Sequence, residues 1–254
     1  MCTGTSYSSA RHPINANRIK RWDWTTSIPE VMDALDAVVK AGKVLYLGIS
    51  DTPAWIVAAA NTYATANGKT PFSVYQGRWN VMTRDFERDI IPMARHFGMA
   101  LCPWDVLGGG KFQSKKAIEE RQKSGEKLRS FFGDDKQTQE QEAISNALEK
   151  VAKEHGEDVS VTAVALAYVM QKTRNVFPIV GGRKVEHLKD NIKGLSIHLS
   201  DKQIESLESV KPFDPGFPTN MIGDDPREGA DAPFLMASSA HVAFQKFAKP
   251  IGHE

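Results

Sequence analysis

The segment from residue 176 to residue 191 carries the strongest chemical signal in the sequence. A run rich in branched apolar residues ends at Gly181 and Gly182, and the basic pair Arg183 and Lys184 follows. Apolar residues at helical spacing come next, so the pattern predicts a buried strand, a tight turn and an amphipathic helix. The first turn of a helix offers N–H groups to an anion, and a guanidinium suits a phosphate. We therefore predict a phosphate site at the carboxyl end of this strand, the alternative being an ordinary loop that binds nothing.

Helices and strands alternate from residue 25 onward, so this segment belongs to a repeating fold. A nearly continuous apolar run at 44–49 predicts a parallel strand covered on both faces, and three further strands alternate with helical stripes. A polar stretch at 111–138, rich in Lys, Glu, Gly and Asp, predicts an exposed excursion or lid. The predicted strands lie at residues 44–49, 72–76, 99–103 and 176–180.

The four strand–helix units favour the later part of a (β/α)8 barrel over a doubly wound sheet, because the sequence has no G-x-G-x-x-G turn. A closed barrel needs eight strands, and residues 1–24 do not read as another repeat. We therefore predict an α/β chain in which the first strands of the barrel are absent. Residues 1–21 are expected to form an unrelated N-terminal segment, and residues 22–254 a partial barrel with a C-terminal tail.

The composition is that of an ordinary globular protein. The 254 residues are 41% hydrophobic and 25% charged with a formal net charge of +1, so we expect no nucleic acid and no membrane as partner. Cys2 and Cys102 lie far apart and the histidines lack metal-ligand spacing, so we predict no metal site and a reducing, cytoplasmic location. No apolar run reaches the length of a membrane span.

Six segments, in order along the chain, resemble the aldo-keto reductases, and in particular the fungal branch of aryl-alcohol dehydrogenases and norsolorinic acid reductases. Together they are far more specific than a single motif. They are Trp-Asp-Trp-Thr-Thr-Ser at 22–27, Gly-Ile-Ser-Asp-Thr-Pro-Ala-Trp at 48–55, Tyr-Gln-Gly-Arg-Trp-Asn at 75–80, Arg-Asp-Phe-Glu-Arg-Asp-Ile-Ile-Pro at 84–92, Pro-Trp-Asp-Val-Leu-Gly-Gly-Gly-Lys-Phe at 103–112, and Val-Gly-Gly-Arg-Lys-Val-Glu-His-Leu-Lys-Asp-Asn at 180–191.

The resemblance implies an oxidoreductase that reduces an aldehyde or ketone with NADPH and without a metal. In this family, hydride passes from the nicotinamide to the carbonyl carbon while a tyrosine donates a proton to the oxygen. A lysine and an aspartate tune that tyrosine, since a phenol is a poor acid at neutral pH until a nearby cation stabilises its phenolate. The implied cofactor is NADP(H), and the implied partner is a small carbonyl substrate.

The resemblance also implies a set of cofactor contacts. Ser50 and Gln76 match the positions that hydrogen-bond the nicotinamide carboxamide, and Asp51 stands where many family members have Asn. Gly182 and Arg183 match the 2′-phosphate site, where a guanidinium favours NADP over NAD. The other implied contacts are Trp104, Asp105, Val106, Leu107, Gly108 and Gly109 along the ring and pyrophosphate, and His187 and Asn191 near the adenine.

No residue of this sequence is predicted to be catalytic. The resemblance places the Asp, Tyr and Lys of the family's tetrad in the first barrel strands, which no segment here matches, and its His position falls at Lys20 or Arg21. Two hypotheses therefore remain. The first is a reductase acting on aryl, polyketide-like or terpenoid-like carbonyls in secondary metabolism, and the second is a truncated, inactive NADP-binding chain. Open strand edges and an exposed apolar interior further predict an oligomer.

Aromatic residues near the strands could be functional or structural. Adjacent strand residues point to opposite faces, so Tyr75 and Tyr46 are expected to pack in the fold rather than replace the missing acid. Trp55, Trp79 and Trp104 follow strands, and two interpretations stay open for them. In the first interpretation they line the mouth of a site for an aromatic substrate, and in the second they pack within the fold.

Overall fold

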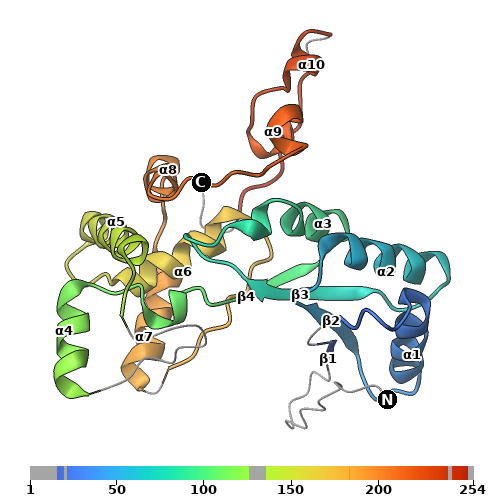
Figure 1. Ribbon diagram of the computed structural model, residues 1–254, viewed down its shortest axis with the longest axis horizontal. Helices are drawn as coiled ribbons and strands as arrows, with labels where there is room; N and C mark the ends of the chain where they lie inside the picture. Colours follow the sequence, from blue (N-terminus) through green and yellow to red (C-terminus); the bar gives the residue numbers. More distant parts are fainter. Residues whose placement is uncertain (1–15, 20–21, 126–135, 183, 240–241, 251–254) are drawn as a thin grey trace.

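The structure is a computed structural model of the chain, and it describes residues 16–19, 22–125, 136–182, 184–239 and 242–250. In this part, four parallel strands form one open sheet whose spatial order follows the sequence, and helices connect successive strands (Figure 1). The strands are β1 (Ala16–Ile19), β2 (Tyr46–Ser50), β3 (Phe72–Arg78) and β4 (Ala100–Trp104).

Two of the helices begin at capping residues that the sequence predicts. The Ser27 hydroxyl accepts a hydrogen bond from the Glu30 N–H at 3.3 Å, and Ser200 with Gln203 forms a reciprocal capping box. The helices are α1 (Ile28–Lys40), α2 (Ala54–Ala66), α3 (Ile90–His96), α4 (Lys115–Ser124), α5 (Gln139–His155), α6 (Val161–Lys172), α7 (Val185–Lys193), α8 (Asp201–Ser209), α9 (Thr219–Ile222) and α10 (Phe234–Ala237), and the 3-10 turns are η1 (Asp85–Glu87), η2 (Gly108–Gly110), η3 (Gly194–Ser196) and η4 (Pro226–Glu228).

Strands β2, β3 and β4 confirm three of the predicted strands within one or two residues at each end. Strand β1 was not predicted, so the expectation that no repeat precedes Trp24 is wrong. Its four residues, Ala-Asn-Arg-Ile, include no apolar run, and only pairing with β2 makes them a strand. The expected lid at 111–138 contains the helix α4, while residues 126–135 lie outside the described residues.

The fourth predicted strand, 176–180, runs along the free edge of β4. The Leu101 N–H donates to the Asn175 carbonyl, the Phe177 N–H to the Leu101 carbonyl and the Ile179 N–H to the Pro103 carbonyl, each at 2.8 Å. This pattern and the parallel bridge from Leu101 to Val176 extend the parallel sheet by one segment. The segment therefore lies beside β4, where the sequence predicts a strand. The prediction that this strand is buried is wrong, because Phe177, Ile179 and Val180 are 61%, 46% and 39% exposed and nothing among the described residues covers them.

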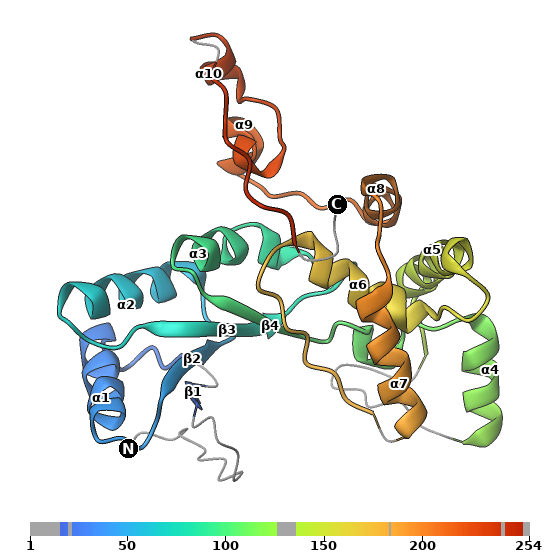
Figure 2. The same cartoon turned by 180° about the vertical axis from the view of Figure 1, so that it is seen from behind.

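The two faces of the sheet differ in burial. Leu47, Ile49, Tyr75 and Leu101 are at most 2% exposed and join one continuous core. Helices α2 and α3 lie over one face of the sheet in both views (Figures 1 and 2). The side chains that alternate with the buried ones on β3 and β4 are only partly buried. They belong to Val74, Gln76, Arg78, Ala100, Cys102 and Trp104.

A cluster of buried charges joins the C-terminal helices to η1. The Arg84 guanidinium lies 2.7 Å from Glu87 and 3.1 Å from Glu208, and the Lys172 ammonium lies 2.6 Å from Glu208. The Tyr168 hydroxyl donates to Glu208 at 2.8 Å, and burial raises the pKa of this phenol well above its ordinary value. The cluster therefore balances two cations against two carboxylates.

Helix α7 presents its apolar stripe to solvent. The predicted stripe residues Val185, Leu188, Ile192 and Leu195 are each more than half exposed, and α7 contacts α6 and η3. The sequence prediction of an amphipathic helix is confirmed. Within the described residues, however, nothing covers its apolar side.

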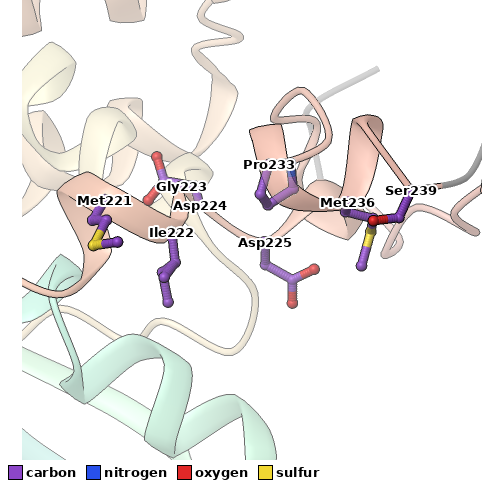
Figure 3. A pocket seen from close by; sticks show the side chains of 8 residues that line it. All are labelled: Met221, Ile222, Gly223, Asp224, Asp225, Pro233, Met236 and Ser239. Carbon is purple, nitrogen blue, oxygen red and sulfur yellow. The ribbon is translucent and has the colours of Figure 1, made fainter.

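The C-terminal tail extends away from the sheet beyond α3 and α8 (Figures 1 and 2). Arg88 donates to the Pro215 carbonyl at 2.8 Å, and the Arg95 guanidinium lies over the Phe247 ring at 5.3 Å, so both ends of the tail contact α3 or the turn before it. Between α9 and α10 lies an open hollow of about 660 Å³, lined by side chains such as Met221 and Met236 (Figure 3). Across the described ranges, no helix combines the length and apolarity needed to cross a membrane.

Candidate functional site

Polar and aromatic side chains gather where β2, β3 and β4 end. The register places Ser50 opposite Gln76 and Arg78 opposite Trp104. The fold thus brings three predicted site residues together on adjacent strands, although they lie far apart in the sequence. They are Ser50, Gln76 and Trp104. This is the carboxyl edge of a parallel sheet, where α/β folds bind their ligands.

Asp51 connects these three residues. Its N–H donates to the Gln76 carbonyl at 2.9 Å, and its carboxylate accepts from the Ser50 hydroxyl and from the Trp104 indole, both at 3.0 Å. Its φ of 49° lies in the left-handed region, which Asp and Asn tolerate better than most residues. The sequence left the role of Asp51 uncertain, because many family members have Asn at this position. The indole that reaches Asp51 comes from 53 residues further along the chain.

Asp105 forms a second polar group at the same edge. Its carboxylate lies 2.6 Å from the Arg78 Nε, and its carbonyl accepts from the Asn80 amide at 2.9 Å. Like Asp51, it has a positive φ, of 61°. Arg78 and Asn80 were missed as site residues, although both lie in the segment 75–80 that carried the resemblance. The Asp105 carboxylate is therefore directed to a guanidinium, which leaves it poorly placed to face a phosphate.

The loop after β4 is a tight glycine turn. Val106 is buried in the core, so only its backbone could meet a ligand, and Leu107 is partly buried. Gly108 and Gly109 have φ angles of 58° and 67°, and a Cβ on Gly108 would lie 2.9 Å from the Phe112 ring. The turn thus depends on glycine both for its conformation and for its packing.

Two polar side chains after this turn were missed by the sequence analysis. Lys111 is only 8% exposed. The Gln113 Oε1 atom is a buried acceptor with no hydrogen-bond partner among the described residues. Burying an acceptor without a hydrogen-bond partner costs free energy. The region behind the glycine turn therefore contains a polar atom whose hydrogen bond the described residues do not supply.

The predicted phosphate site follows the segment paired with β4. Gly182 packs against α7 so closely that a Cβ on it would lie 2.7 Å from the His187 Cβ. Lys184 precedes α7 and makes no side-chain cap, and the His187 N–H donates to the Lys184 carbonyl at 3.2 Å. The N–H groups of Val185 and Glu186 are therefore the first-turn donors proposed for an anion. His187 is exposed and Asn191 is partly buried. The predicted phosphate ligand Arg183 lies outside the described residues.

The described tyrosines lie in different parts of the fold. Tyr75 is 1% exposed, its hydroxyl donates to the Thr52 carbonyl at 2.6 Å, and burial raises its pKa, so the prediction that it packs in the fold is confirmed. Tyr46 begins β2 and is 56% exposed, so the same prediction is wrong for Tyr46. Tyr63 lies on α2 and Tyr168 on α6.

The three tryptophans have different environments. Trp79 is fully buried, stacks on Phe86 and donates to Glu87 at 3.2 Å, so it is packing. Trp55 is exposed on α2. Trp104 alone of the three joins the carboxyl-edge cluster, where it bonds to Asp51.

A sequence model described as the aldo/keto reductase family matches residues 12–212. The chain belongs to the aldo-keto reductase family. It is 66% identical over 223 residues to the probable aryl-alcohol dehydrogenase AAD4 of Saccharomyces cerevisiae, covering 88% of this chain and 68% of that protein.

Two further relatives are named for an activity. The chain is 50% identical over 222 residues to an aryl-alcohol dehydrogenase [NADP(+)] of Phanerodontia chrysosporium, covering 87% of this chain and 56% of that one. It is 47% identical over 210 residues to norsolorinic acid reductase A of Aspergillus parasiticus, covering 83% and 51%. The resemblance inferred from the sequence is thus confirmed, and the chain spans between 51% and 68% of the length of these three proteins.

Proposed function

We propose that this chain binds NADP(H) along the carboxyl edge of its sheet and serves the reduction of an aldehyde or ketone to an alcohol. The proposed substrates are aryl, polyketide-like or terpenoid-like carbonyl compounds of secondary metabolism. The proposal rests mainly on the environment of the Gln76 side chain. Its amide is half-buried at the end of β3 between the Ser50 and Trp104 strands, and it makes no hydrogen bond within the described part of the chain.

The hydrogen-bonding side chains at the ends of β2 and β3 fit the nicotinamide end of the cofactor. An amide and a hydroxyl can together satisfy the carbonyl and amino group of a carboxamide, as Gln76 and Ser50 would do. The partly buried Trp104 indole offers a flat apolar surface beside them for an aromatic ring. When bound, the cofactor supplies the hydride, and these residues hold and orient the ring that carries it.

The other end of the proposed site fits a phosphate. The glycine turn at 181–182 lets the backbone approach closely, and the uncapped first turn of α7 supplies N–H donors. Arg183 and Lys184 add two positive charges. We assign the 2′-phosphate to Gly182 and Arg183, the adenine to the neighbourhood of His187 and Asn191, and the pyrophosphate to the backbone of 104–109.

We also propose that the chain forms part of a (β/α)8 barrel. Parallel strands that follow one another in sequence order, with no reversal of that order, favour the later part of a (β/α)8 barrel over a doubly wound sheet. We propose the cytoplasm as the compartment, in keeping with two widely separated cysteines.

A second candidate function is cofactor binding without turnover. It is favoured by the tyrosines in the described residues. Tyr46, Tyr63 and Tyr168 lie away from the carboxyl edge, and the Tyr75 hydroxyl is buried and hydrogen-bonded to Thr52. Loss of general-acid assistance typically costs on the order of 10²–10⁴ in rate. Under this alternative the chain binds NADP(H) but reduces carbonyl compounds at a negligible rate.

Titration of the chain with NADPH, followed by fluorescence, tests the proposal. Saturable binding that weakens about tenfold in Gln76→Ala is expected, since one or two hydrogen bonds are lost. Glu149→Gln on α5 is the matched control and should bind like the wild type. Assaying aldehyde reduction on the same samples separates the two candidates, and absence of binding by the folded wild type contradicts both.

A further inference from the structure

The Asp51 carboxylate occupies the centre of the proposed nicotinamide site. It accepts hydrogen bonds from Ser50 and Trp104, two of the residues assigned to the ring, and its backbone bonds to Gln76, the third. A group held by all three of these residues cannot be far from a ring that contacts them. Asp51 is also exposed, so a ligand can reach it.

Within the described residues, the charge on Asp51 is not balanced by a neighbouring cation. Its two hydrogen-bond donors, a hydroxyl and an indole, are both neutral. Among the described residues, no Lys, Arg or His nitrogen lies within ion-pair distance of it. Asp105, at the same edge, is different, because the Arg78 guanidinium lies 2.6 Å from its carboxylate. In the part of the cluster that the structure describes, the unbalanced negative charge is therefore that of Asp51.

We infer that Asp51 makes this site discriminate between the two redox forms of the cofactor, in favour of the oxidised form. The inference rests on the proposed function. The nicotinamide ring carries one positive charge when oxidised and none when reduced, whereas both forms carry the same phosphates. A carboxylate beside the ring therefore attracts NADP⁺ and leaves NADPH almost unaffected. The consequence is a site biased toward the oxidised cofactor, and thus toward alcohol oxidation relative to an otherwise equal site with a neutral residue.

The test compares the dissociation constants of NADP⁺ and NADPH for wild type and Asp51→Asn. Asparagine keeps the size of the side chain and an oxygen that can accept from Trp104, but it removes the charge. The ratio of the two constants is the informative quantity, because contributions from the phosphate end cancel in it. We expect Asp51→Asn to weaken NADP⁺ relative to NADPH by roughly three- to tenfold, as one partly solvated charge a few ångström away would do.

Two controls make the result specific. Glu149→Gln removes a carboxylate from α5, which packs against α6 and α8, and should leave the ratio unchanged. In 1 M KCl, where the Debye length is about 3 Å, the difference between wild type and Asp51→Asn should shrink. If both cofactors bind Asp51→Asn with the wild-type ratio, the inference is overturned while the proposed function stands. If the folded wild type binds neither form, the proposed function is overturned and the inference with it.

Discussion

The Trp104 indole nitrogen lies 3.0 Å from the Asp51 Oδ1 atom, so a side chain at the end of β4 is hydrogen-bonded to one at the end of β2 across the intervening strand β3. Strand ends are followed by loops, which are usually more mobile than the strands themselves. A hydrogen bond that spans three strands fixes their ends relative to one another. The ring surface proposed for the nicotinamide is thereby oriented before any ligand arrives.

Replacing Trp104 by Phe keeps an aromatic ring but removes the donor to Asp51. We expect NADPH affinity to fall about three- to tenfold, because the ring would no longer be held in place and one hydrogen bond to a charged group is lost. Fluorescence or calorimetric titration measures the change. Trp55→Phe, at an exposed position on α2, serves as the control, and equal affinities for the two variants would contradict the role given to the Trp104–Asp51 pair.

The buried charge cluster predicts a large stability effect at Glu208. Glu208→Gln leaves Arg84 and Lys172 with one carboxylate between them, and it should lower the free energy of unfolding by about 2–4 kcal/mol. Glu205→Gln, exposed on the same helix, should change it by less than about 0.5 kcal/mol. Urea unfolding followed by circular dichroism gives both values. Similar values for the two variants would mean that the cluster contributes little.

Asp36 predicts a pH dependence on the acid side. A hydrogen bond from Lys40 and others from Thr70 hold the pKa of this carboxyl below its usual 3.8. The unfolded state therefore takes up a proton first, so the stabilising effect of ionised Asp36 is present above pH 3.8 and is lost as the pH falls through the lowered native pKa. Wild type should exceed Asp36→Asn in stability at pH 6, and the difference should vanish in strong acid. A difference that is constant with pH would exclude this linkage.

The exposed stripe of α7 predicts self-association, which the sequence analysis predicted on other grounds, namely open strand edges. Leu188→Glu, in the middle of the stripe, should shift the chain toward monomers, because a charge there opposes burial of the apolar side. Met221→Glu on α9 changes another exposed apolar residue, 71% exposed against 57% for Leu188, and should leave association unaffected. Analytical ultracentrifugation over a range of concentrations measures the oligomeric state of the wild type and both variants. A wild type that stays monomeric at every concentration would show that the stripe is not covered by a second copy.

Local sequence patterns predicted most helices and strands. Strand β1 and the arrangement of the site depend on contacts between residues far apart in the sequence. The apolar runs of β2, β3 and β4 and the capping residues Ser27 and Ser200 act within a few residues, so the sequence announces them. Strand β1 lacks such a pattern and exists through its ladder with β2. The same holds for the site. Ser50 and Gln76 stand at predictable strand ends, whereas the bond between Trp104 and Asp51 depends on the register of three strands.

The most direct test of the central claim is a crystal structure of this chain grown with NADP⁺. The account predicts the carboxamide within hydrogen-bond distance of Ser50 and Gln76, the ring beside Trp104 and Asp51, and the 2′-phosphate at Gly182 and Arg183. A cofactor bound elsewhere, or bound with its phosphates at the ends of β2 and β3, would contradict it.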